Sequence, residues 1–89
     1  MEITVEISMY PLREDYETAI LSFIHNVKAE KGVEVIVNPT ATHLFGEYDL
    51  VMKTLQIHIK RSFENYGKAV FAFKVLNGNL RDSLKGKNL

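Results

Sequence analysis

The alternation of apolar and polar residues near the N-terminus predicts a first strand. Apolar side chains occupy every second position: Ile3, Val5, Ile7 and Met9. A period of two is typical of a strand that has one apolar and one polar face. Pro11 ends the pattern, because proline cannot donate to a strand ladder. The polar face of this strand would carry Thr4, Glu6, Ser8 and Tyr10.

From about residue 14 the apolar period lengthens to that of a helix. Tyr16, Ile20, Phe23 and Val27 recur at steps of three and four residues. Asp15 is a suitable N-cap and Gly32 a suitable stop, so we predict a helix that runs to about residue 31.

The second half of the chain repeats the order of strand and helix. Residues 33–38 are rich in β-branched side chains and predict a strand, and Asn38-Pro39-Thr40 is a turn. Residues 41–45 predict a short third strand closed by Gly46. A second helix is expected over 47–66 and a last strand over 68–76. The buried stripe of this helix would carry Val51, Met52, Leu55, Ile59, Phe63 and Tyr66.

This order predicts a ferredoxin-like βαββαβ sandwich of the α+β class, with a four-stranded antiparallel sheet and two helices on one face. We expect one ligand-binding domain over 1–80 and a polar, Lys-rich, mobile tail over 81–89. The second sheet face is semi-polar. We expect it to stack on another copy in a homodimer or homotetramer.

Composition removes several classes of function. The formal net charge is +0 and there is no cysteine, which argues against nucleic acid, thiol chemistry and cysteine-bound metals. No serine lies in a G-x-S-x-G elbow, and neither His25 nor His58 has a second histidine at the spacing of a metal site. We therefore expect no catalysis, no metal and no cofactor. The sequence has no signal-peptide pattern and no apolar run that could span a bilayer, so we expect a cytoplasmic protein without membrane insertion.

The segment 37–49 concentrates hydroxyl, amide, imidazole, aromatic and carboxylate groups around one hairpin and the following helix start. Each has a structural explanation: Asn38 suits a turn, and Glu47 suits a first helical turn. Together with 8–12 on a neighbouring strand, however, they form a polar cluster with aromatic walls. Ligand pockets have this mixture.

Three pieces of the chain resemble a known family. These are Ile7-Ser8-Met9-Tyr10-Pro11-Leu12, then 42–49 with its T-x-L-x-G-E pattern, and 67–71. They resemble the small thiamine/hydroxymethylpyrimidine-binding proteins (YkoF-like, related to DUF77). The resemblance implies a ferredoxin-like fold, association through sheets, and binding of thiamine or its hydroxymethylpyrimidine moiety without catalysis, in salvage or transport. The family often carries serine before the motif threonine, whereas this chain has Ala41.

The chemistry of thiamine suggests roles for the clustered residues. Thiamine joins a flat aminopyrimidine to a cationic thiazolium, which favours hydrogen-bonding groups, an aromatic slot and an anionic neighbour. We expect Ser8, Asn38 and Thr42 at the pyrimidine edge. The remaining candidates are Glu47 as the carboxylate, Tyr10 and Phe45 as stacking surfaces, and Glu6 and His43 as further contacts. Glu6 pairs equally well with Lys74 on a neighbouring strand.

Three other functions stay open at this stage. An ACT-like regulatory domain would bind an amino acid at a dimer interface, but its usual glycine is missing from the turn over 11–15. An acylphosphatase-like enzyme would need an anion-binding glycine-rich loop there, and only Arg13 is present. A purely structural oligomerisation domain has no local signature. The fold alone decides none of these.

Overall fold

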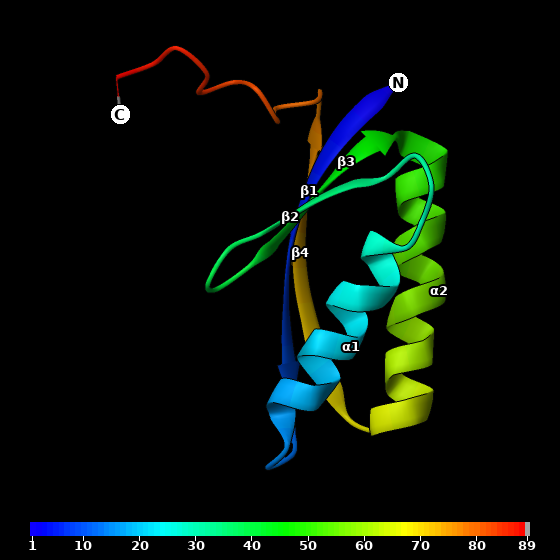
Figure 1. The fold of residues 1–89 in the computed structure, drawn as a ribbon. Helices are drawn as coiled ribbons and strands as arrows, with labels where there is room; N and C mark the ends of the chain where they lie inside the picture. The colour runs from blue at the N-terminus through cyan, green and yellow to red at the C-terminus, as the bar shows by residue number, and fades with distance from the viewer. Residues whose placement is uncertain (89) are drawn as a thin grey trace.

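The computed structural model describes residues 1–88, and it confirms the predicted βαββαβ order. The four strands form one antiparallel sheet in the order β2-β3-β1-β4. Figure 1 shows both helices on one side of this twisted sheet. The fold is therefore the ferredoxin-like α+β sandwich that the sequence predicts. Its elements are β1 (Glu2–Pro11), α1 (Tyr16–Lys28), β2 (Glu34–Val37), β3 (Thr42–Glu47), α2 (Tyr48–Tyr66) and β4 (Ala69–Asn77).

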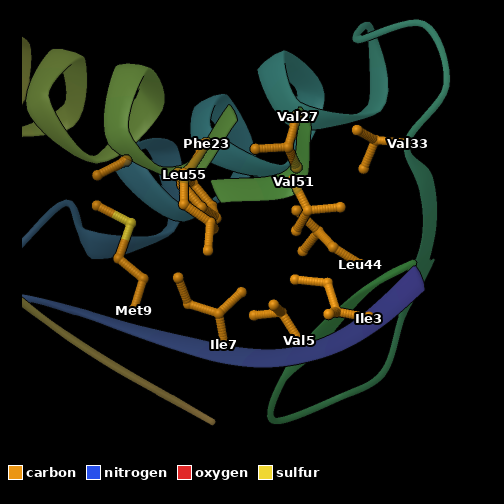
Figure 2. Close-up of a cluster of buried hydrophobic side chains, with 11 residues drawn as sticks. Ile3, Val5, Ile7, Met9, Phe23, Val27, Val33, Leu44, Val51 and Leu55 are labelled. Carbon is orange, nitrogen blue, oxygen red and sulfur yellow. The ribbon is translucent and has the colours of Figure 1, made fainter. Parts of the chain in front are cut away.

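The core lies between the sheet and the two helices. Strand β1 is central, and its odd-numbered apolar side chains point towards α1 and α2 (Figure 2). Val5, Val27, Leu44 and Val51 are 0% exposed. Full burial of such a side chain stabilises the fold by about 1.5–3 kcal/mol. Because alternate residues of a strand face opposite sides, this core fixes Thr4, Glu6, Ser8 and Tyr10 on the helix-free face, as predicted.

The predicted limits of α1 need correction. The helix ends at Lys28, because the amides of Ala29 and Glu30 bond to carbonyls only three residues back, which tightens the last turn. Gly32 lies beyond this end, in the turn before β2, with φ +85°. Asp15 does occupy the N-cap position, but its carboxylate accepts a hydrogen bond from the Thr18 hydroxyl (2.7 Å) instead of from a backbone amide.

Gly46 has a different role from the one predicted. It lies within β3 and does not close it. A Cβ at this position would lie 2.9 Å from the carbonyl oxygen of Gly32 and 3.2 Å from Cγ2 of Val51. The missing side chain therefore lets β3 approach both the turn before β2 and helix α2.

The predicted buried stripes are only partly right. Phe23, Val27, Val51 and Leu55 are buried as predicted, whereas Tyr16 is 55% and Phe63 45% exposed. Each helix is rotated about its axis relative to the prediction, so that small or polar residues are buried at several positions where larger apolar ones were expected. These small or polar residues are Ala19, Thr54, His58 and Ser62. Phe63 instead packs edge-on against Phe71 at the sheet margin, with 5.7 Å between ring centroids.

Residues 78–88, which we call the C-terminal strap, begin with four residues that contact the sheet. Gly78 donates its amide proton to the carbonyl oxygen of Glu2 (3.0 Å). Arg81 forms an ion pair with Glu34 of β2, at the opposite sheet edge from β4. The strap leaves β4 on the side away from the helices (Figure 1). The contacts of Gly78, Asn79, Leu80 and Arg81 hold the start of the strap against the helix-free face. Within residues 1–88, no helix has the length and apolar character needed to cross a membrane.

Candidate functional site

The strand register places two rows of side chains across the helix-free face. In one row Glu6 lies between His43 of β3 and Lys74 of β4, and Ile36 of β2 follows His43. In the next row Thr4 lies between its partners Phe45 and Leu76, and Glu34 is paired with Phe45. Neighbouring strands are about 4.8 Å apart, so each row is continuous.

These rows form the floor of a pocket of about 350 Å³, which we call the face pocket. Its floor is Thr4, Glu6, Ile36, His43, Phe45, Lys74 and Leu76, and Asn38 of the β2–β3 turn lies at its edge. Its outer wall comes from the strap: Leu80, Arg81, Ser83 and Leu84. Apolar side chains with a few polar groups are the usual lining of a small-molecule site.

A chain of polar contacts crosses the floor. Nδ2 of Asn38 lies 2.7 Å from Nδ1 of His43, and Nε2 of His43 lies 3.5 Å from Oε2 of Glu6. The other carboxylate oxygen of Glu6 is 3.4 Å from Nζ of Lys74. Glu6 is therefore paired with Lys74, which is one of the two roles that its sequence position left open. The Glu6 side chain stays 41% exposed, which leaves its carboxylate open to a ligand.

The rings of His43 and Phe45 provide an aromatic surface beside this chain. Their planes differ by 16° and their centroids are 6.2 Å apart. Phe45 is only 5% exposed, so the accessible part of this surface is mainly the His43 ring, whose side chain is 29% exposed. A flat heterocycle can stack on such a surface, and a cation gains from the negative faces of the rings.

A second pocket of about 310 Å³, the hairpin pocket, opens on the helix side of the β2–β3 turn. Ser8, Asn38 and Thr42, the three residues predicted at the pyrimidine edge, are among its lining residues. Its walls are largely apolar and come from β1, α1 and the turn. The Ser8 hydroxyl donates a hydrogen bond to the carbonyl oxygen of Thr40 (3.0 Å). Asn38 is the residue that lines both pockets.

The structure thus divides the eight predicted site residues. Four lie together at the face pocket: Glu6, Asn38, His43 and Phe45. Thr42 faces the helices opposite Ile7 and is 6% exposed, while Glu47 is the N-cap of α2. Thr42 lines the hairpin pocket, whereas Glu47 lines neither the face pocket nor the hairpin pocket. Tyr10 is 56% exposed and lines neither pocket.

Several residues that close the face pocket were not predicted from the sequence. Ile36 and Leu76 could have been found, since each occupies an alternating position that pairs onto the same face. The strap residues Leu80, Arg81 and Leu84 have no periodic signal, because they belong to no strand or long helix. Across residues 1–88 no group of three His, Cys, Asp or Glu side chains is placed to hold a metal ion.

Comparison with solved structures finds the same fold in several proteins. A Streptococcus pneumoniae protein aligns with a TM-score of 0.81 and 21% identity over 90% of each chain. A Thermotoga maritima protein named as a "putative thiamine biosynthesis/salvage protein" aligns with a TM-score of 0.78 and 20% identity, over 88% of this chain and 85% of its own. A domain of unknown function, DUF77, from Bacillus cereus aligns with a TM-score of 0.80 and 18% identity, over 100% of this chain and 91% of its own.

These structural neighbours are consistent with the resemblance noted from the motifs. At such low identity they establish a shared fold and leave the ligand open. No protein-family model matches the chain. No curated protein matches it in sequence.

Proposed function

We propose that this protein binds thiamine, or its hydroxymethylpyrimidine moiety, in the face pocket and does not chemically transform it. One observation carries the proposal: a carboxylate, an amide and a nearly parallel aromatic pair lie together on the pocket floor, in Glu6, Asn38, His43 and Phe45. The name of the Thermotoga neighbour and the sequence motifs support the same ligand class.

The electrostatics of the floor suit a cationic ring. Glu6 is the carboxylate at the centre of its row, and its partner Lys74 has a 76% exposed side chain. An ion pair with so exposed a lysine contributes only about 0–1 kcal/mol. A thiazolium can therefore replace the Lys74 ammonium beside Glu6 at little cost, and it would also lie against the more exposed ring of His43.

The two ends of thiamine would then contact different groups. The thiazolium would lie beside Glu6, and the aminopyrimidine would present its donors and acceptors to Asn38 at the pocket edge. Free hydroxymethylpyrimidine has the same pyrimidine donors and acceptors but lacks the permanently charged thiazolium. The structure therefore predicts different dependence on Glu6 for the two molecules.

Association of chains is a further part of the proposal. The strap covers one end of the helix-free face, whereas Tyr10 and Val70 at the other end are 56% and 50% exposed. Stacking of two copies there would bury apolar surface, which favours a dimer or tetramer. Sedimentation of a single monomeric species at high concentration would contradict this part.

Calorimetric titration tests the proposed ligand. The wild-type protein is titrated with thiamine, hydroxymethylpyrimidine and a panel of amino acids, and the recovered ligand is analysed for chemical change. We expect micromolar binding of the first two, about −8 kcal/mol, and unchanged ligand. Binding of an amino acid alone would favour an ACT-like regulator, and conversion of the ligand would contradict the non-catalytic part.

The variant Glu6→Gln tests the site. Loss of a charged partner costs about 1.5 kcal/mol or more, roughly a tenfold weaker affinity for thiamine. The affinity for hydroxymethylpyrimidine should fall only slightly. The control is Glu64→Gln, which removes the same charge from an exposed position on α2. Equal losses for both ligands would show that the cation is not held by Glu6.

A further inference from the structure

We infer that the C-terminal strap forms the outer wall of the ligand site, and that the Arg81–Glu34 ion pair is the positioning contact that holds it there. The ligand part of this inference rests on the proposed function. The docking of the strap rests on contacts within the chain alone.

Two contacts to β1 fix where the strap begins. The hydroxyl of Thr4 donates to the carbonyl oxygen of Gly78 and accepts from the amide of Leu80, both at 2.8 Å. Thr4 is 6% exposed. A hydroxyl this deeply buried needs partners, and these two strap atoms supply them on the helix-free side. Asn79 adds a hydrogen bond from its amide nitrogen to Oε1 of Glu2 (3.1 Å).

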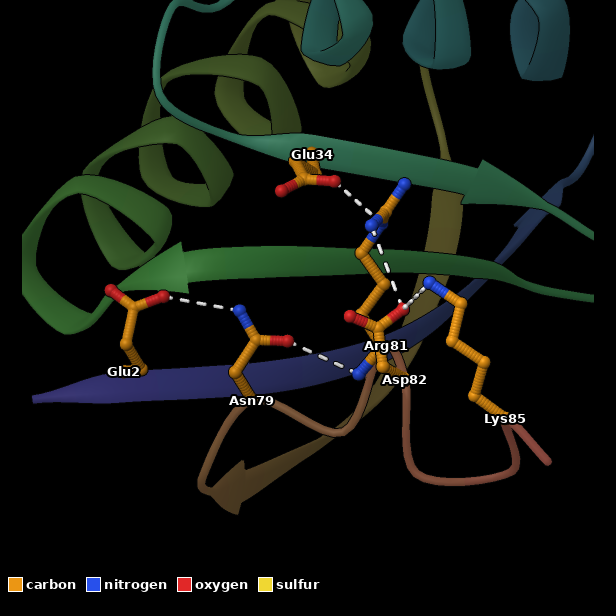
Figure 3. Close-up of polar contacts among 6 residues, drawn as sticks. All are labelled: Glu2, Glu34, Asn79, Arg81, Asp82 and Lys85. Carbon is orange, nitrogen blue, oxygen red and sulfur yellow. Dashed lines mark hydrogen bonds and ion pairs between the residues drawn. The ribbon is translucent and has the colours of Figure 1, made fainter. Parts of the chain in front are cut away.

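Arg81, the fourth residue of the strap, reaches the other edge of the sheet. Figure 3 shows the Arg81 guanidinium lying against the Glu34 carboxylate of β2. The backbone amide of Arg81 donates to Oδ1 of Asn79 (3.1 Å), which turns the chain towards β2. Asp82 lies 3.7 Å from Arg81 and 3.6 Å from Lys85. Through the Arg81 side chain, the contacts of the strap therefore reach from β4, which it leaves, to β2.

This path places two leucines over the pocket floor. Leu80 and Leu84 line the face pocket together with Phe45 and Leu76. They are 41% and 63% exposed, so a flat ligand between strap and sheet would remove more apolar surface from water. Leu80 and Leu84 would then contact the bound ring directly, while Arg81 acts on it only through the position of the strap.

The first measurement is hydrogen exchange of the Leu80 amide in the full chain. We expect it to be protected in the wild type, since it bonds to the buried Thr4 hydroxyl. Arg81→Gln and Glu34→Gln should each speed exchange about threefold to fivefold, as expected for a partly exposed ion pair. The Leu80 amide of the double variant should exchange only slightly faster than that of either single variant, because both changes break the same ion pair. Lys87→Gln, which removes one positive charge from the same strap, is the control and should change nothing.

The second measurement is calorimetric titration of the same variants with thiamine. Arg81→Gln and Glu34→Gln should weaken binding much less than they speed exchange, because a strap that protects Leu80 is docked most of the time and its docked fraction changes little. Leu80→Ala should weaken it about tenfold, because an apolar contact with the ring is lost. The control is Leu12→Ala, which truncates an exposed leucine distant in sequence, on the β1–α1 turn, that does not line the face pocket.

The outcomes separate the two claims. An unprotected Leu80 amide in the wild type, or exchange that is insensitive to both ion-pair variants, overturns the strap. Tight thiamine binding that Leu80→Ala leaves unchanged would show that the strap does not form a wall of the ligand site. The proposed function would still hold. Absence of thiamine and hydroxymethylpyrimidine binding, with Leu80 protected and sensitive to Glu34→Gln, overturns the proposed ligand while the docked strap stands.

Discussion

Asn38 orients His43. The amide nitrogen of Asn38 is 2.7 Å from Nδ1 of His43, and an amide nitrogen only donates. Nδ1 must therefore accept, which leaves the proton of the neutral imidazole on Nε2, the atom that faces Glu6 at 3.5 Å. The turn residue thus sets the direction of the polar chain along the floor of the face pocket.

Replacement of Asn38 by alanine should release this orientation. We expect the imidazole ¹⁵N spectrum of neutral His43 to change from one dominant tautomer to a mixture. Ligand affinity should fall about threefold to tenfold, the value of one neutral hydrogen bond. Asn26→Ala on α1 is the matched control, because Asn26 lines neither described pocket. A wild-type His43 that is already a tautomer mixture would show that Asn38 does not orient it.

The sequence predicted the fold well because the signals for the fold are local. Alternation in β1, the turn at Asn38 and the stop at Gly67 each depend on neighbours in the chain, and each has its predicted place. The register between strands is also implied by burial of one face, since a slip of one residue would expose Val5 and Leu44.

The site was harder to predict because it depends on contacts between distant segments. Thr42 and Glu47 are close in sequence, yet strand parity turns Thr42 to the helices and helix geometry makes Glu47 a cap. The strap reaches the pocket through Thr4, from which Gly78 is 74 residues away in the chain. Neither periodicity nor residue type signals such a contact. Glu6, His43 and Phe45 were chosen for their chemical type, and the strand register brings them onto one face of β1 and β3.

Glu47 should matter for stability and not for ligand binding. Its carboxylate accepts a hydrogen bond from the amide of Leu50 (3.2 Å) at the start of α2, and it lies 3.9 Å from the N-terminal amine. Loss of such a cap costs about 0.5–2 kcal/mol. We expect Glu47→Ala to lower the free energy of unfolding by this amount in urea, with thiamine affinity unchanged. A large loss of affinity in a folded Glu47→Ala protein would return Glu47 to the ligand site.

Glu30 should be important for stability although it lies outside any pocket described here. Its Oε1 is 2.8 Å from Nε2 of His58, which is 4% exposed on α2. Removal of the carboxylate leaves that buried imidazole nitrogen without its partner, which costs about 1–3 kcal/mol. We expect Glu30→Ala to lower the urea midpoint clearly and Glu17→Ala, at an exposed position in the first turn of α1, to leave it unchanged. Similar midpoints for both variants would show that the pair contributes nothing measurable.

Gly46 should tolerate no side chain. Its backbone has no positive φ, so conformational strain is not the reason. The reason is space, since a Cβ would meet the carbonyl oxygen of Gly32 at 2.9 Å and the Val51 side chain at 3.2 Å. Val51 is 0% exposed and cannot move aside freely. Overpacking of this kind costs about 1–3 kcal/mol, so Gly46→Ala should lower the midpoint of thermal unfolding by several degrees.

The comparison is Gly86→Ala in the strap, where a Cβ meets nothing within 4 Å and φ is +76°. That variant strains only the local backbone and should leave the global midpoint nearly unchanged. If Gly46→Ala unfolds at the wild-type temperature, the turn before β2 can move away from β3, and the close approach is not needed for the fold.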